Sequence, residues 1–166
     1  MKACMTMVLI GCAVCVVAHA AESGSEEGFV SIFNGRNLAG WQGAVEGASA
    51  QDGILVHEEG KLYTEQEYAN FVLRFEFKTV KGGNNGVGIR ATLDGNPAYD
   101  GMEIQILDHD DARYADVKPY QVHGSICGVV PAKGVALKRV GEWNTEESRA
   151  EGGKIKVTLN GEVIVD

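Results

Sequence analysis

The sequence predicts an all-β protein, a sandwich or barrel of antiparallel strands. Apolar residues recur mostly at every second position, which is the spacing of a strand with one buried face. Turn-forming residues interrupt these stretches at short intervals, in a chain with 22 glycines and 3 prolines. The sequence contains no long amphipathic helix pattern. Many short strands joined by close turns are typical of sandwiches and barrels.

The strands expected before the C-terminal part follow one another closely. They are Phe29–Phe33, Ile54–His57, Lys61–Thr64, Asn70–Val80, Val87–Ala91, Met102–Leu107 and Ser125–Val130. The second and third flank Glu58-Glu59-Gly60, which predicts a hairpin. Gly82–Asn85 predicts a turn between the fourth and fifth.

Two segments carry the clearest strand signals. In Asn70–Val80 four apolar residues alternate with Val72 and three charged residues, so one face packs on a core and the other meets water. The four are Phe71, Leu73, Phe75 and Phe77. In Lys154–Asp166, Asn160-Gly161 is flanked by alternating apolar residues, the strongest short hairpin signal. Both segments favour an antiparallel sheet.

The first 20 of the 166 residues have the layout of a secretory signal peptide. Lys2 precedes an apolar stretch that ends in small residues at Ala18 and Ala20, so cleavage is expected after Ala20. Residues 21–28 are then a short tether and residues 29–166 a single domain. We expect export to the periplasm or beyond, without a membrane span. A second interpretation is a lipoprotein signal, with a lipid anchor on Cys12.

Charge and motifs exclude several classes of function. The net charge is −8, and it becomes −9 when Lys2 is removed with the signal peptide. An acidic chain without a cluster of basic residues is not expected to bind nucleic acid. Cys127 is then the remaining cysteine, which leaves no internal disulfide and no cysteine-based zinc site. Patterns typical of dinucleotide sites, P-loops and serine hydrolases are absent.

The segment Met102–Leu107 raises a functional question, because its two faces differ. Met102, Ile104 and Ile106 share one face, while Glu103 and Gln105 share the other with Leu107. From the pattern alone, a solvated outer face is the favoured interpretation of the two polar residues. The alternative is that they form the floor of a site.

Several segments, taken in order, resemble a known family. They are FNGRNLAGW, LYTEQEYANFVLRFEFK, GGNNGVGIR, YDGMEIQILD, GSICGVVPAKG, GEWN and LNGEVIVD, from about Phe29 to Asp166. Together they resemble the domain of unknown function 1080, also named the 3-keto-disaccharide hydrolase domain. The resemblance implies a concanavalin A-like jelly-roll β-sandwich in a secreted bacterial protein that acts on 3-keto glycosides. Family members continue beyond the final hairpin, so this chain is expected to lack the C-terminal strands of the sandwich.

The resemblance favours a site on the strand that carries Glu103. Glucanases of this class place three acids on one face through a bulge, and the equivalent positions here are Glu103, Gln105 and Asp108. A bulge near Ile106–Leu107 would bring Asp108 onto the face of Glu103. Because Gln105 cannot ionise, it is expected to bind substrate by hydrogen bonds, and the usual two-carboxylate mechanism is disfavoured.

A 3-keto sugar permits another route. A base removes the C2 proton, the C1 substituent leaves by elimination, and water adds, so that the sum is hydrolysis. The base is expected to be Glu103 or Asp108, His123 is expected to act as acid or base, and Arg90 to bind the developing oxyanion. For Arg90 a surface ion pair is an equal alternative.

Other residues near this strand have two interpretations each. Trp143 and Asn144 could stack on a sugar ring and bond its hydroxyls, or fill the core and cap a turn. His123 or His109 could hold a divalent metal ion with Glu103 and Asp108, although no cofactor is certain. The four aspartates of residues 108–116 do not fit a calcium loop, because Arg113 stands where glycine is needed, so a solvated acidic loop is expected.

The alternative function is a non-catalytic, lectin-like glycan-binding module that uses the same face without a base. A third possibility is a secreted structural sandwich or inactive fragment. A carbohydrate partner is expected in the first two cases, and nucleic acid in none.

Overall fold

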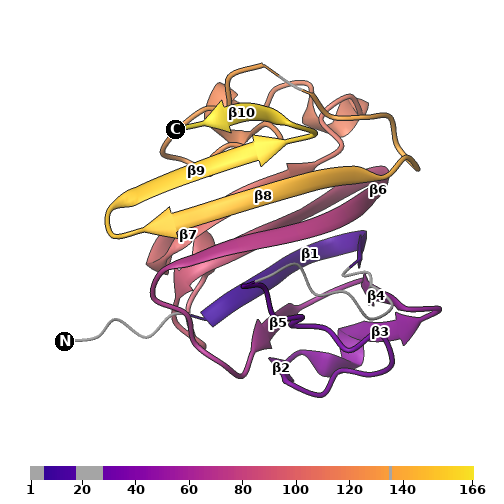
Figure 1. Cartoon of the computed structure of the whole chain (residues 1–166). Coiled ribbons are helices and arrows are strands. Elements are labelled where there is room, and N and C mark those ends of the chain that lie inside the picture. The colour runs from indigo at the N-terminus through magenta and orange to yellow at the C-terminus, as the bar shows by residue number, and fades with distance from the viewer. Residues whose placement is uncertain (1–5, 18–27, 135) are drawn as a thin grey trace.

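The computed structural model describes residues 6–17, 28–134 and 136–166. Ten strands of the described chain form one curled antiparallel sheet (Figure 1), in the order β10-β9-β8-β6-β1-β4-β3, with β2 on β5, β5 on β1 and β7 on β6. The helical elements are short: α1 (Pro97–Asp100), η1 (Val45–Gly47), η2 (Ala112–Tyr114) and η3 (Pro119–Gln121). The prediction of an all-β, antiparallel jelly-roll sandwich is confirmed.

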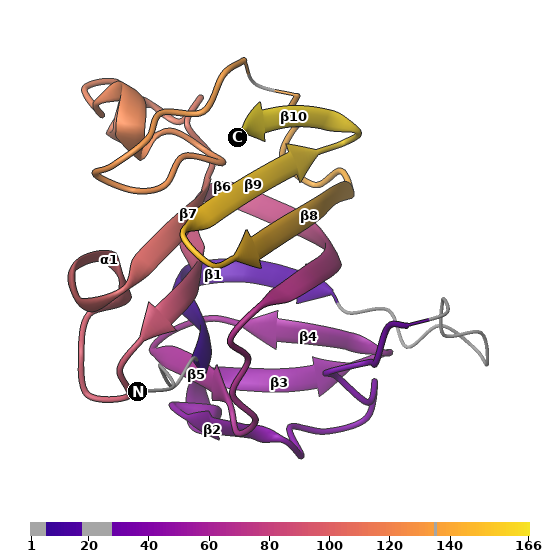
Figure 2. The same ribbon diagram turned by 60° about the vertical axis from the view of Figure 1, so that its left-hand side comes forward.

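The long strand β6 (Phe71–Ala91) organises the sheet. One of its edges pairs with β1 (Thr6–Val17). Its other edge pairs first with β8 (Asn144–Glu151), through Phe71–Phe77, and then with β7 (Met102–Leu107), through Asn84–Ile89. β7 and β8 thus pair with different parts of the same edge of β6. Because β6 curls between these parts, β7 and β8 belong to two different layers. The hairpin of β9 (Lys154–Leu159) and β10 (Glu162–Val165) extends the β8 layer (Figure 2).

The core joins residues from both layers. Phe77 of β6 belongs to the same buried cluster as Ile104 and Ile106 of β7 and Val157 and Leu159 of β9. All five side chains are at most 1 % exposed. Burying such side chains stabilises the fold by roughly 1.5–3 kcal/mol each.

The four remaining strands lie on the side of β1 away from β6 (Figures 1 and 2). They are β2 (Trp41–Gly43), β3 (Ala48–Gln51), β4 (Ile54–His57) and β5 (Lys61–Thr64). The bounds expected for β4 and β5 are confirmed, but the hairpin between them is wrong. β4 pairs with β3 and β1, whereas β5 pairs with β2 and β1.

Three other expectations about strands are wrong. Gly82–Asn85 is no turn, because β6 runs through it; Gly82 has φ +64° and a shift in the β1 ladder absorbs the extra residues. Ser125–Val130 makes isolated bridges at Ile126 in place of a strand. Phe29–Phe33 is also no strand, although Phe33 is 1 % exposed and belongs to the core.

The C-terminal hairpin is confirmed. Strands β9 and β10 are joined at Asn160 and Gly161, with φ of 47° and 88°. Two positive φ angles suit the right-handed twist of the paired strands, which is why Asn-Gly is favoured there.

Strand β1 lies inside the segment predicted to be a signal peptide. The cleavage position and residues 21–27 of the predicted tether lie outside the described residues. The signal peptide therefore stays a prediction. Among the described residues, no helix has the length and apolar character to cross a membrane.

Candidate functional site

Strand β7 is regular along its whole length. Its ladder with β6 steps without interruption from Met102, opposite Ile89, to Leu107, opposite Asn84. The bulge expected near Ile106–Leu107 is therefore wrong. Asp108 continues the same register, because its backbone N–H donates to Gly83 O at 2.9 Å. The residue that shares the face of Glu103 and Gln105 is Leu107.

The face of β7 that carries Glu103 and Gln105 is buried and polar. The two residues are 9 % and 7 % exposed, so the interpretation as a solvated outer face is wrong. Their partners on β6 are Gly88 and Gly86, which have no side chains to cover this face. The Glu103 side chain lies across Gly86, since a Cβ built on Gly86 would be 2.5 Å from Cγ of Glu103. Glycine at this position makes room for the carboxylate.

The electrostatics of Glu103 follow from its burial. Burial raises the pKa of the Glu103 carboxyl to about 6, from an ordinary 4.5. Desolvation disfavours the charged form of an acid, and no ion pair to Glu103 is found among the described residues. A carboxyl with this pKa can gain and lose a proton near neutral pH. Its neighbour Gln105 has a buried Oε1 that accepts no hydrogen bond from the described residues.

The free edge of β7 is covered by the segment from His123 to Cys127. Gln105 N donates to Ser125 O at 3.0 Å, Gly124 N to Gln105 O at 2.7 Å, and Cys127 N to Glu103 O at 2.8 Å. These bonds fix the backbone of both polar residues from the side opposite β6. Burial also raises the pKa of the Cys127 thiol, with the Glu103 charge as the smaller cause, so the thiol is protonated at neutral pH.

His123 lies at the same edge and is uncharged. Its Nδ1 accepts from Leu107 N at 3.3 Å, which leaves the proton on Nε2, and its ring stacks on Phe77 at 5.3 Å between centroids. Burial, with a smaller contribution from the nearby His109, lowers the pKa of His123 to about 3. Its Nε2 has no partner among the described residues. In this state His123 is a weak base and carries no positive charge.

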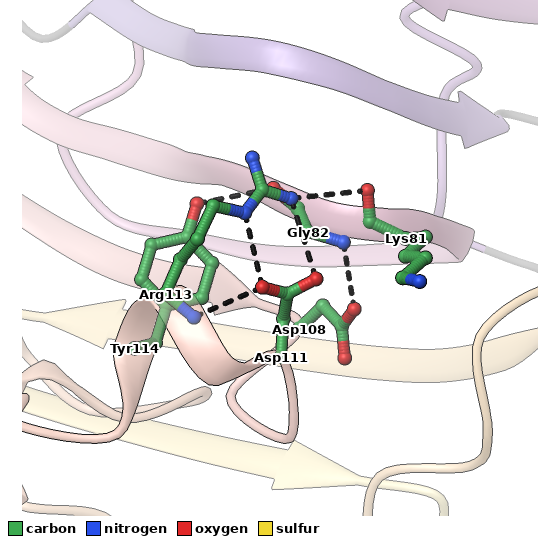
Figure 3. Close-up of polar contacts among 6 residues, drawn as sticks. All are labelled: Lys81, Gly82, Asp108, Asp111, Arg113 and Tyr114. Carbon is green, nitrogen blue, oxygen red and sulfur yellow. Dashed lines mark hydrogen bonds and ion pairs between the residues drawn. The ribbon is translucent and has the colours of Figure 1, made fainter.

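Asp108 fastens the end of β7 to β6 (Figure 3). Its Oδ2 accepts from Gly82 N at 2.7 Å, and its backbone O accepts from Asp111 N at 3.1 Å. Asp111 in turn binds Nε of Arg113 at 3.0 Å, and the Tyr114 hydroxyl donates to Gly82 O at 3.0 Å. The side chain of Asp108 is thus a clamp on the glycine segment.

The acidic loop is only partly solvated. The carboxylate of Asp110 is 95 % exposed, whereas that of Asp111 is 9 % exposed. Hydrogen bonds from Arg113 hold the pKa of Asp111 below its ordinary value. The expectation of a solvated loop holds for Asp110 and is wrong for Asp108 and Asp111.

Of the predicted sugar-binding residues, Gln105 lies beside Glu103 on β7, whereas the side chains of Arg90 and Trp143 make their contacts with other parts of the chain. Arg90 has φ +55° and its guanidinium donates to the backbone oxygen of Gly152, in the β8–β9 turn. The Trp143 ring lies under Nζ of Lys78 at 4.8 Å. Because Lys78 and Phe77 point to opposite faces of β6, Trp143 and His123 lie on opposite sides of that strand.

Asn144 has the role of the second interpretation, that of a turn residue. It is fully buried, and its Oδ1 accepts from Lys138 N and from Asn160 Nδ2, both at 2.9 Å. Its Nδ2 donates to Glu142 O at 3.2 Å. The side chain therefore ties residues 138–144 to the β9–β10 turn.

A metal site is not apparent in the described part of the chain. No group of three or more His, Cys, Asp and Glu side chains there is arranged to hold a metal ion. Glu103, Asp108 and His123, the residues proposed from the sequence as ligands, have the separate surroundings given above. A divalent cation stays a prediction.

One component of the site escaped the sequence analysis. Gly86 and Gly88 alternate with Val87 and Ile89, so this part of β6 has one apolar face and one face without side chains. Alternating glycines inside a strand indicate the close approach of another group. That signal was present in GGNNGVGIR, but the sequence interpretation placed a turn at Gly82–Asn85 and a strand at Val87–Ala91 and gave the alternating glycines no role.

Comparison with known proteins gives consistent matches. A model of the 3-keto-alpha-glucoside-1,2-lyase-like domain matches residues 28–166. The chain is 29 % identical over 174 residues to a 3-keto-disaccharide hydrolase of Bacteroides thetaiotaomicron, covering 84 % of this chain and 58 % of that protein. The chain thus spans less than two thirds of this curated relative.

Solved structures from Parabacteroides distasonis share the fold. One, described as a candidate glycosyl hydrolase, has a TM-score of 0.72 at 34 % identity, covering 78 % of this chain and 66 % of that one. A second, with the same description, has a TM-score of 0.71 at 24 % identity, covering 83 % and 70 %. The second likeness concerns the fold alone.

Proposed function

Because the chain belongs to the family of 3-keto-alpha-glucoside-1,2-lyase-like domains, we propose that it is an exported carbohydrate-active enzyme that cleaves 3-keto glycosides. The curated relative named 3-keto-disaccharide hydrolase supports this substrate class. The proposal rests mainly on the surroundings of Glu103. Its carboxyl is buried, has a pKa of about 6, and lies on a face of β7 whose paired residues on β6 are glycines. Next to it, Gln105 offers an unused buried acceptor.

Glu103 is proposed as the base. Its carboxylate takes the proton from C2 of the 3-keto sugar, and the electron pair of the C–H bond forms an enolate with the C3 oxygen. The C1–O bond then breaks, the leaving group departs with the electron pair and takes up a proton, and an enone remains. Water adds across the double bond, so the sum of the two stages is hydrolysis.

The neighbouring residues are proposed to position the substrate and the base. Gln105 Oε1 accepts a sugar hydroxyl, which a buried and unpaired acceptor favours. Asp108 and His123, whose side chains bond to backbone groups of Gly82 and Leu107, hold the end of β7. Sugar contacts from Arg90, Trp143 and Asn144 stay predictions.

The test is turnover of a 3-keto disaccharide by the full chain and by Glu103→Gln. Glu103→Gln should lose about 10²-fold or more in kcat, the range of general base catalysis, while substrate binding persists. Glu147→Gln is the matched control, because it removes a carboxylate that pairs with Arg74 on the surface. Turnover by Glu103→Gln at the rate of the unmodified chain would refute Glu103 as the base.

The same assay separates the alternative, a lectin-like module. A binding module would show saturable sugar binding in both proteins and turnover in neither. Equal binding of a 3-keto disaccharide and its non-oxidised parent would also favour the module, because the base requires the ketone. Calorimetric titration with both sugars measures this difference.

A further inference from the structure

Strand β1 has hydrogen-bonded partners on both of its edges. On one edge it follows β6 from Thr6, opposite Ala91, to Val17, opposite Glu76. On the other edge it pairs with β5 through residues 8–10 and with β4 through residues 14–16. In the described sheet, the β6 half and the half formed by β2–β5 are connected by pairing through this strand.

The same residues carry the features of a cleavable leader. Cleavage after Ala20 would cut the covalent link between β1 and the domain that begins near residue 28. Loss of β1 would then strip the partner from β6 beside Phe77, Thr79 and Val87, which are 0 %, 1 % and 1 % exposed. Each buried backbone group left unpaired costs roughly 1–3 kcal/mol. The backbone groups of β6 therefore still require a hydrogen-bonded strand beside them after cleavage.

We propose that residues 6–17 form an exchangeable strand that stays in the sheet, bound without a covalent link, after the leader has been cut. Backbone hydrogen bonds on both edges hold the segment, which is β-augmentation with the cut leader as the added strand. The sequence TMVLIGCAVCVV suits both roles, because it is an apolar run of the kind found in a leader core and half of its residues are β-branched, which favours a strand. The inference is independent of the sugar chemistry.

The experiment uses the full chain with a protease recognition sequence placed within residues 22–27. After cutting, size-exclusion chromatography with mass spectrometry measures whether the leader peptide elutes with residues 28–166. Co-elution is expected, with an unfolding midpoint that falls on dilution, since the complex is now bimolecular. Ala3→Pro, which precedes the strand, should leave co-elution unchanged.

Val14→Pro is the matched variant within the strand. Val14 pairs with both Thr79 and His57, and proline has no N–H to donate to a ladder. The cut Val14→Pro leader should separate from the domain. Added synthetic peptide of residues 6–17 should then bind the domain in a 1:1 ratio and restore its unfolding midpoint.

Four results would overturn the proposal. The unmodified leader separates while residues 28–166 keep their circular dichroism and unfolding midpoint; the Val14→Pro leader stays bound as firmly as the unmodified one; the added peptide restores nothing; or the cut chain forms dimers. The last result would show that a second copy supplies the strand.

Discussion

Glu146 should make the protein less stable as pH rises from about 4.5 to neutrality. The side chain is 2 % exposed on β8, and burial raises the pKa of its carboxyl to about 7 from an ordinary 4.5. The hydroxyl of Ser148 donates to its Oε1 at 2.8 Å, whereas Oε2 has no partner among the described residues. The folded state therefore holds a proton that the unfolded chain has already released.

The sign and size follow from proton linkage. Because the folded-state pKa lies above the unfolded one, the free energy of unfolding falls with rising pH between 4.5 and about 7. Each unit of pKa difference corresponds to 1.36 kcal/mol, so the loss across this window is about 3 kcal/mol. Glu146→Gln carries no proton equilibrium and should lose this dependence.

The assay is urea unfolding of the unmodified chain and of Glu146→Gln at a series of pH values from about 4 to 8. The Gln amide leaves a donor unpaired, which costs roughly 1–3 kcal/mol at every pH, so the slopes are compared and not the absolute values. Ser148→Ala should steepen the slope, because the serine hydrogen bond lowers the pKa of Glu146. Glu147→Gln, on the opposite and more exposed face, should not reproduce the flattening. Equal slopes for the unmodified chain and Glu146→Gln would refute the reasoning.

Three further predictions concern the proposed site. With Glu103 as base, kcat/KM on a 3-keto disaccharide should rise as pH passes about 6, whereas a flat profile between about pH 5 and 7 would contradict that role. Gly86→Ala should push the Glu103 carboxylate aside and lower kcat about 10²-fold, with Gly153→Ala as the control, since a Cβ at Gly153 meets no atom within 4 Å; equal losses in the two variants would exclude the contact as the cause. Asp108→Ala should lower the free energy of unfolding by about 1–3 kcal/mol in urea titrations by leaving Gly82 N without its acceptor, and Asp108→Asn should recover part of it by keeping an oxygen there; an unchanged midpoint for Asp108→Ala would contradict the clamp.

The sequence was sufficient for the strands whose period is clear. The bounds of β4, β5 and β7 and the Asn160-Gly161 hairpin could be derived from alternation and turn chemistry alone. Strand β8 was missed because its buried face carries Asn144, Glu146 and Ser148, which a hydrophobic pattern does not register. The pairing of strands was also not derivable from the sequence. β4 and β5 are neighbours in sequence, but they do not pair with each other, and both pair with β1.

For the candidate site, the sequence indicated which residue types line the face of β7 but not the backbone geometry that positions them. Glu103 and Gln105 share a buried polar face, as the alternation and the resemblance together indicated. The expected bulge does not form, because the backbone N–H of Asp108 donates to Gly83 O and its carboxylate accepts from Gly82 N. Both contacts are to β6, which is distant in sequence. A single sequence does not carry that long-range information.

The continuity of β6 has a consequence for how the molecule exchanges its amide protons with solvent. Within its 21 residues, two stretches, 76–77 and 84–88, are paired on both edges, whereas β10 is paired on one side alone among the described strands. Deuterium should therefore enter the end strands β10 and β3 first and proceed inward, and the amides near Phe77 and Val87 should exchange last, at a rate governed by global unfolding. Labelling would thus proceed along the sheet order from its edge to its middle.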